Sequence, residues 1–367
     1  MFSQIDLKKL SEISTPDRSF LTLVLPHTYS MKNLEKRFDK IRNALKTHET
    51  EKDELDYFNE NVKLVAKYLE DHSFKSGSIC IFANWIADLF QVHTIPSDMD
   101  ELIWIDSSPY IRPLAELQDD YENVLVVITD NKKARIFMIS SMISEDETVI
   151  HGHIKNHVRK GGWSQQRYER RRDKQLLHYA KDIADAVHEI SKTDVFHRII
   201  LVGGKEILQI VMDHLPPHFR DMVNKKALDL GKSEDIIHHD IMALFDEQER
   251  QSEQDLWEEI RQEYLKGGLG IVGLENVLAA VKIGQVDRAI VNRDFKPMGK
   301  RCRKCEHLEI ESVDQCSKCQ SDSLFDVDVV NEIVELLKLS GGEIEFTDPI
   351  DTLSSAGNIA AKLRYKI

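Results

Sequence analysis

The chain has 367 residues, of which 41% are hydrophobic and 31% are charged, and its formal net charge is -14 at pH 7. This composition is typical of a folded protein and excludes disordered and fibrous chains. No stretch approaches the roughly 18 continuous apolar residues of a membrane span, and the first residues lack the apolar core of a signal peptide. We therefore expect a cytoplasmic protein without a membrane partner. The length predicts two or three domains.

The first segment, residues 1–120, is predicted to be a small α/β domain. Apolar runs predict strands at 21–25, 78–82 and 90–95, and apolar residues at helical spacing predict helices over 34–45 and 55–69. Prolines at 96, 109 and 113 indicate an exit into a linker near residues 118–122. The histidines of this segment are scattered, so nothing in it predicts a chemical site.

The second segment, residues 121–245, opens with a predicted β-hairpin formed by 124–128 and 134–139. A long helix follows over 164–191, with Ser164 as its N-cap and Leu176 and Leu177 on its apolar face. A strand at 198–202 leads into Gly203-Gly204 and another helix. The glycines lack the spacing of a phosphate-binding loop, so a tight turn is the simpler interpretation.

The third segment, residues 246–367, follows a helix predicted to begin near Ser233. Its acidic stretch, 246–263, is expected to be a solvent-facing helix surface. Beyond it we expect helices over 274–283 and 329–339 and strands over 289–291 and 342–346. All three segments together predict an α/β fold in which each domain is a mixed sheet with helices.

Four of the five cysteines form two Cys-x-x-Cys pairs, Cys302 with Cys305 and Cys316 with Cys319, separated by ten residues. Two such turns can present four thiolates to one tetrahedral Zn²⁺ and leave no open position for a catalytic water. We predict a structural zinc ribbon inserted in the third domain, with the basic residues inside the pairs offsetting the thiolate charge. Cys80 lies in an apolar run and is expected to be a buried thiol. This cysteine usage indicates a reducing compartment.

Residues 155–174 are basic in an otherwise acidic chain. They hold eight Lys and Arg residues against two acids, and His151, His153 and His157 lie around their start. Such a concentration of positive charge predicts a polyanionic partner, because each neutralised phosphate releases counterions. A solvated basic helix face without a partner is the alternative. Gly161 and Gly162 would let the backbone approach RNA closely.

Two sets of motifs resemble the archaeo-eukaryotic class-one release factor and Pelota family. The family signature GGQSxxRFxRxR is matched by seven residues of the basic segment: Gly161, Gly162, Ser164, Arg167, Tyr168 in the place of phenylalanine, Arg170 and Arg172. In the third segment, GLENVLAAVKIGQVDRAIV at 273–291, the cysteine pairs and GNIAAKLRY at 357–365 are similar to the family's third domain. The first segment is similar only in outline.

The resemblance implies a three-domain, tRNA-shaped protein that enters the ribosomal A site and contacts rRNA of both subunits. Residues 1–120 would face the decoding centre, and the loop of residues 121–245 would face the peptidyl-transferase centre. Residues 246–367 would contact a translational GTPase of the EF-Tu class. The resemblance leaves P-site tRNA open as a further partner, and we expect no DNA partner.

The chain departs from the family at one decisive position, because Trp163 stands where the family has the glutamine that positions a water against the peptidyl-tRNA ester. Tryptophan has one N–H donor and no acceptor, but it can stack on an unpaired base. The stop-codon motifs NIKS and YxCxxxF are also absent from the sequence.

Two hypotheses follow from these departures. The first is a non-enzymatic factor that keeps the ribosome inactive or protected, as in the Balon-like hibernation branch of the bacterial relatives. The second is a ribosome-rescue peptidyl-tRNA hydrolase that uses Gln165 or Gln166. An unrelated zinc-ribbon RNA-binding protein is a third interpretation.

On the ribosomal hypotheses, the residues expected to contact rRNA are Arg159, Lys160, Gly161, Gly162, Trp163, Ser164, Gln165, Arg167, Arg170, Arg171 and Arg172. Arg171 or Arg172 could instead pair with the acids of the same helix, Glu169 and Asp173.

Overall fold

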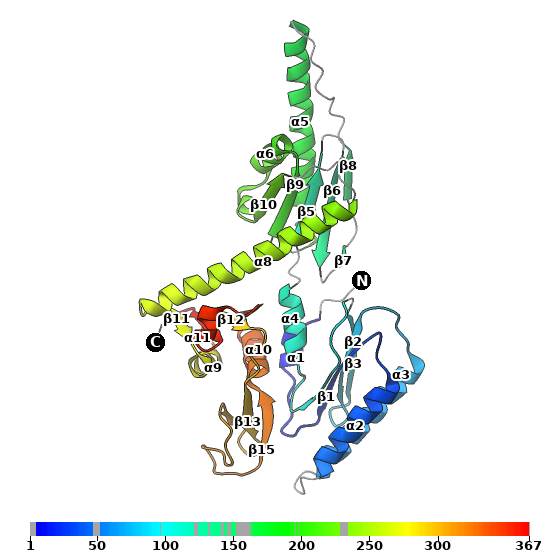
Figure 1. Cartoon of the computed structure of the whole chain (residues 1–367), viewed down its shortest axis with the longest axis vertical. Helices are drawn as coiled ribbons and strands as arrows, with labels where there is room; N and C mark the ends of the chain where they lie inside the picture. Colours follow the sequence, from blue (N-terminus) through cyan, green and yellow to red (C-terminus); the bar gives the residue numbers. More distant parts are fainter. Residues whose placement is uncertain are drawn as a thin grey trace. The chain divides into compact units, whose positions relative to one another are not determined.

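The computed structural model describes residues 5–46, 52–95, 97–120, 124–130, 133–140, 143–144, 148–151, 163–194, 196, 198–227 and 234–366. The chain forms two compact units (Figure 1). Unit 1 combines Met1–Asp119 with Arg250–Ile367, and unit 2 is Asp120–Glu249. Within the described ranges, no helix combines the length and apolar character that a membrane crossing requires.

The N-terminal part of unit 1 is a four-stranded antiparallel sheet in the order β3-β2-β1-β4. Its elements are α1 (Leu7–Ser11), β1 (Phe20–Pro26), α2 (Met31–Lys46), α3 (Lys52–Asp71), β2 (Ser78–Asn84), β3 (Leu89–Ile95), β4 (Leu102–Asp106) and α4 (Arg112–Asp120). Leu21, Leu23 and Leu25 of β1 pack against α2 and α3, whereas Val24 belongs to a second core on the other face. The first six residues of β1 are therefore buried, because both faces of this sheet are covered.

The C-terminal part of unit 1 contains a mixed sheet in the order β11-β17-β12-β16 and a separate three-stranded sheet, the ribbon, in the order β14-β13-β15. Its elements are β11 (Gly270–Val272), α9 (Leu274–Lys282), β12 (Val286–Asn292), β13 (Met298–Cys302), β14 (Leu308–Glu309), β15 (Leu324–Asp328), α10 (Val329–Ser340), β16 (Glu343–Thr347), α11 (Asp351–Ser355) and β17 (Ile359–Leu363). Helices α9 and α10 share one hydrophobic core with Val24 and Phe82 of the N-terminal sheet.

Unit 2 is built on a six-stranded sheet in which β5 and β9 are parallel central neighbours. Its elements are β5 (Val124–Thr129), β6 (Lys133–Ser140), β7 (Ile143–Ser144), β8 (Thr148–His151), α5 (Trp163–Ile190), β9 (Arg198–Gly203), α6 (Lys205–His214), α7 (Pro217–Arg220), β10 (Val223–Ala227) and the first part of α8 (Glu234–Leu265). One face packs on α5 and α6, and the other packs on Phe245 of α8.

Helix α5 is much longer than the strands beside it. Its 28 residues span about 42 Å at the usual helical rise. The eight residues of β6, the longest strand of unit 2, span about 26 Å. The first turns of α5 therefore extend beyond the sheet, as Figure 1 shows for this unit.

The predicted α/β class is confirmed, and the long predicted elements are present. The linker expected near residues 118–122 is wrong in its first part, because α4 continues to Asp120. Ser164 is not an N-cap, since α5 already begins at Trp163. Leu177 is 40% exposed instead of lying in the core.

The acidic stretch 246–263 is not uniformly solvent-facing. Glu253 lies buried and accepts a hydrogen bond from Thr347 Oγ1 at 2.8 Å. The boundaries of the three predicted domains stay a prediction. In the structure, residues from the first and third of them share unit 1.

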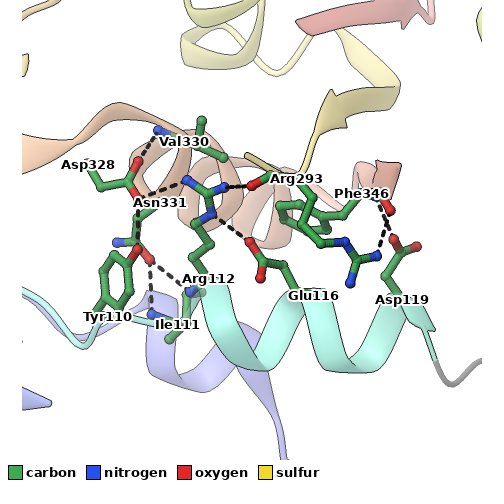
Figure 2. Close-up of polar contacts among 10 residues, drawn as sticks. All are labelled: Tyr110, Ile111, Arg112, Glu116, Asp119, Arg293, Asp328, Val330, Asn331 and Phe346. Carbon is green, nitrogen blue, oxygen red and sulfur yellow. Dashed lines mark hydrogen bonds and ion pairs between the residues drawn. The ribbon is translucent and has the colours of Figure 1, made fainter. Parts of the chain in front are cut away.

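Helix α10 is buried on nearly all sides and carries three buried polar side chains, Asn331, Glu332 and Glu335. Asn331 Oδ1 accepts hydrogen bonds from the backbone N–H groups of Ile111 and Arg112, both at 3.0 Å (Figure 2). The N–H groups at the start of a helix, here those of Ile111 and Arg112 for α4, have no carbonyl acceptor within the helix itself. Helix α10 therefore caps α4 from across the unit.

Arg112 is the buried cation where α4 meets α10, and only 1% of its side chain is exposed. Its Nη1 pairs with Asp328 at 3.0 Å, its Nε with Glu116 at 2.7 Å, and its Nη2 donates to the carbonyl of Arg293 at 2.8 Å (Figure 2). Asp328 also accepts from the Tyr110 hydroxyl at 2.7 Å and from Val330 N at 2.9 Å, which makes it the N-cap of α10. Each carboxylate oxygen of Asp328 is therefore satisfied inside the protein.

We predict that Asp328→Asn lowers the free energy of unfolding of unit 1 by about 2–4 kcal/mol, because it leaves the buried Arg112 charge with only the less buried of its two carboxylate partners, Glu116. Urea denaturation of the full chain measures the change. Asp326→Asn on the same strand is the matched control, since Asp326 is 62% exposed and pairs with Lys300 at the surface. That control should cost less than about 1 kcal/mol. Equal losses in both variants would contradict the prediction.

Glu335 should make stability depend on pH. Burial raises the pKa of its carboxyl to about 8 from 4.5, although Ser108 Oγ and Asn331 Nδ2 donate to Oε1 at 2.8 and 2.7 Å. A carboxyl with a raised folded-state pKa ionises more readily in the unfolded chain, so its stabilising effect is complete below about pH 4.5 and is lost as the pH rises toward 8.

We predict that Glu335→Gln, which keeps the Oε1 acceptor, removes on the order of 2–4 kcal/mol of this pH dependence between pH 5 and 8. Thermal unfolding of the full chain across this range tests it. Glu343→Gln, at a carboxylate that is 74% exposed, should leave the wild-type pH slope in place. A wild-type slope in Glu335→Gln would refute the assignment.

Candidate functional site

The four cysteines of the two pairs come together at one end of the ribbon. Their sulfur atoms all lie within 4.8 Å of one another, and Cys302 and Cys316 are buried. Cys302 Sγ is 3.5 Å from Cys319 Sγ, and Cys305 Sγ is 3.5 Å from Cys316 Sγ. Sulfurs about 2.3 Å from a common tetrahedral metal ion would lie roughly 3.8 Å apart. The cluster therefore has dimensions that suit one metal ion, and the predicted grouping of these residues is confirmed.

The two cysteine turns have the same backbone geometry. In each turn, the carbonyl of the first cysteine accepts from the residue that follows the second: Cys302 O from Glu306 N at 2.8 Å, and Cys316 O from Gln320 N at 2.9 Å. Glu306 and Gln320 both have positive φ, 56° and 59°. Burial opposes ionisation of Cys302, but hydrogen bonds from the N–H groups of Cys305 and Lys304 and from the neighbouring thiols together lower the pKa of this thiol to about 7. The N–H group of His307 has the opposite effect at Cys305, but burial and the neighbouring thiols raise the pKa of Cys305 to about 12. The first turn thus favours a thiolate at Cys302.

The arginines that flank Cys302 have partners outside the cysteine cluster. Arg303 Nη1 pairs with Glu54 of α3, and its guanidinium lies 5.0 Å from the centre of the Phe325 ring. Arg301 Nη1 donates to Ser107 Oγ at 3.1 Å, and Nη2 pairs with Glu332. The prediction that basic residues within the pairs offset thiolate charge is therefore wrong for Arg303, whose charge is paired with a buried carboxylate.

The residues of the basic segment fall into three groups. Arg159, Lys160, Gly161 and Gly162 lie outside the described residues. Trp163, Ser164, Gln165 and Arg167 lie in the first two turns of α5. Arg170 and Arg171 follow them and are exposed.

Arg172 is buried, with 8% of its surface exposed. Its Nη1 and Nη2 donate to the two carboxylate oxygens of Glu206 on α6, at 3.0 and 2.5 Å. Asp173 lies 3.9 Å from the same guanidinium. Arg172 thus joins α5 to α6, whereas Arg170 and Arg171 are exposed to solvent.

Residues 109–250 match the family model named Bacterial archaeo-eukaryotic release factor family 10. Peptide chain release factor subunit 1 of Archaeoglobus fulgidus is 25% identical over 292 residues, which cover 71% of this chain and 70% of that protein. Its counterpart in Methanocaldococcus jannaschii is 24% identical over 299 residues, with the same coverage. Over residues 109–250 the chain is therefore similar to this bacterial family, and over most of its length it is similar to archaeal release factors.

Solved structures with a likeness to this chain include S. cerevisiae Dom34, described as a translation termination-like factor that interacts with Hbs1. It has a TM-score of 0.42 and 12% identity, covering 79% of this chain and 81% of that one. Another is a ribosome-bound archaeal Pelota with ABCE1, with a TM-score of 0.40 and 14% identity, covering 81% and 80%.

Sequence reasoning did not find the polar residues that join the two parts of unit 1. Ser107 and Arg112 lie beside prolines that predict the end of the first domain and the start of a linker. Glu54 has the sequence pattern of a solvent-facing acid on an amphipathic helix. The one available signal was the run Asp328 to Glu335, in which four polar side chains interrupt an otherwise apolar helix start. A buried helix with polar residues on several faces requires partners on each of them.

We predict different effects on stability for the adjacent residues Arg171 and Arg172. Arg172→Met should lower the free energy of unfolding of unit 2 by roughly 1–2 kcal/mol, because it removes a bidentate pair between the buried Arg172 and the half-exposed Glu206 that joins α5 to α6. Arg171→Met, at an exposed neighbour, should change stability by less than about 0.5 kcal/mol. Chemical denaturation of both variants measures the difference. Equal stability of the two variants would show that the pair with Glu206 contributes nothing.

Proposed function

We propose that this protein is a ribosome-binding factor that occupies the A site and keeps the ribosome inactive or protected, without reading stop codons and without hydrolysing peptidyl-tRNA. The observation that carries the proposal is Trp163, which follows the two glycines where the family signature has its water-positioning glutamine. An indole cannot accept a hydrogen bond from an attacking water, so it cannot replace the amide in hydrolysis. Its flat ring can stack on an exposed base.

The charge distribution supports an RNA partner for this end of the molecule. The chain carries -14 overall, yet residues 155–174 hold eight basic residues against two acidic ones. Arg170 and Arg171 are exposed on α5. Trp163 begins this helix, so the positive end of the helix dipole lies beside the glycine pair in sequence. These features favour insertion of residues 159–171 among rRNA phosphates at the peptidyl-transferase centre.

The cysteine cluster is proposed to hold a structural Zn²⁺. Four thiolates without a further donor suit zinc among the metals that proteins commonly bind through sulfur, and they fill all of its tetrahedral positions. Cys302, Cys305, Cys316 and Cys319 would hold the ion, which would stabilise the fold and take no part in a reaction.

The family resemblance also suggests the remaining partners. We propose delivery by a translational GTPase of the EF-Tu class through residues 246–367, and contact with P-site tRNA near the basic segment. Residues 1–120 would lie at the decoding centre. A factor of this kind acts where ribosomes are, in the cytoplasm.

A peptide-release assay distinguishes occlusion from hydrolysis. Ribosomes carry labelled peptidyl-tRNA in the P site and an empty A site, and co-sedimentation confirms that each variant binds. We expect the wild type to bind and release no peptide, and Trp163→Gln to release as much or more. Release by the wild type that disappears in Gln165→Ala/Gln166→Ala would instead make this protein a hydrolase.

The binding surface is tested in the same assay with charge reversals on one helix. Arg170→Glu/Arg171→Glu should weaken ribosome binding at least about tenfold. The slope of log affinity against log salt concentration should fall by the amount expected for about two lost phosphate contacts. Lys192→Glu, just beyond the other end of α5, is the control and should bind as the wild type does. Equal binding by all three proteins would contradict the assigned surface.

A further inference from the structure

The cysteine ribbon is tied to the N-terminal sheet by the residues on either side of a cysteine. Arg301 and Arg303 flank Cys302, and they reach Ser107 and Glu54, which are 194 and 249 residues away in sequence. Ser107 follows β4, and Glu54 lies in the first turn of α3. One cysteine turn therefore contacts two separate elements of the N-terminal part of unit 1.

These contacts are buried. Glu54 has 3% of its side chain exposed and Glu332 has 4%, whereas Arg303 and Arg301 have 15% and 17%. Arg18 Nη1 is the second cation near Glu54, at 3.8 Å from Oε2. The guanidinium groups of Arg18 and Arg303 both lie over the ring of Phe325, at 5.6 and 5.0 Å. A buried carboxylate that loses its close cation keeps the full cost of its desolvation.

The position of Arg303 depends on the backbone of the cysteine turn. Arg303 N donates to Ser323 O at 3.0 Å, and Cys302 N donates to His307 O at 2.9 Å. The turn also contains Glu306 in a left-handed conformation that is unfavourable for a residue with a side chain. Sulfur atoms packed this closely repel one another as thiolates unless a cation lies between them. A bound metal ion therefore stabilises the turn that aims Arg303 at Glu54.

We propose that this part of unit 1 is a metal-dependent clasp, formed by Arg301 and Arg303 on the ribbon and by Glu54 and Ser107 on the N-terminal part. Metal binding at the cysteines determines how firmly the start of α3 and the end of β4 are held against the C-terminal part. The proposal rests on the metal site proposed above and is independent of ribosome binding.

Hydrogen–deuterium exchange of the full chain tests the clasp, with zinc content measured by metal analysis before and after treatment with EDTA. We expect removal of Zn²⁺ to speed exchange at least about tenfold in residues 52–62 and 102–108. Residues 176–187 of unit 2 should exchange as before. Faster exchange confined to the ribbon, residues 298–328, would overturn the proposal.

Two variants of the zinc-loaded protein separate the clasp from general unfolding. Arg303→Met keeps an apolar stem over Phe325 but removes the charge, so we expect one zinc per chain and faster exchange in residues 52–62. Lys304→Met, at the exposed neighbour in the same turn, is the matched control and should exchange as the wild type does. Glu54→Gln combined with Arg303→Met should recover part of the lost protection, because the buried carboxylate that has lost its closer cation is then neutral.

The outcomes distinguish this proposal from those on which it rests. A chain that binds no zinc overturns both the zinc assignment and the clasp. A chain that binds zinc but whose Arg303→Met variant exchanges normally in residues 52–62 overturns the clasp alone. Either result leaves the peptide-release and ribosome-binding assays to be judged independently.

Discussion

The ion pair between Arg112 and Asp328 is the interaction on which unit 1 depends. Both side chains are almost completely buried and come from parts of the chain 216 residues apart. Buried charges are tolerated only when each has a close partner and satisfied hydrogen bonds, and this pair has Tyr110, Glu116 and the carbonyl of Arg293 around it. Asn331 completes the junction by capping α4. The apolar second face of the N-terminal sheet can therefore pack on α10 without leaving polar groups unpaired.

The cysteine ribbon extends this junction along β13. Arg301 and Arg303 pair with Glu332 and Glu54, so the ribbon contacts both α10 and the start of α3. On the clasp proposed above, a metal ion bound by the four cysteines would hold the backbone from which the half-buried Arg301 and Arg303 reach their partners.

The role proposed for the basic segment requires charges that are available to a partner. Arg170 and Arg171 are exposed on α5, while the next residue, Arg172, pairs with Glu206 and holds the helix to α6. A long helix that carries charge at one end and is anchored farther along can present that end to a partner without losing its own stability. The role proposed for Trp163 requires such a support, since stacking is effective only when the ring is held in place.

The residue pattern alone predicts the α/β class, the strands and helices with strong apolar periodicity, the four-cysteine cluster and the similarity to release factors. These features are local, because they depend on spacing along the chain and on the chemistry of short motifs. The tertiary structure decided which charges are buried. Arg112, Arg303 and Glu54 look like surface residues in sequence, and Arg172 looks identical to its neighbours in the run Arg170 to Arg172. Each of them has a partner between 34 and 249 residues away, and no local pattern specifies which distant carboxylate an arginine will meet.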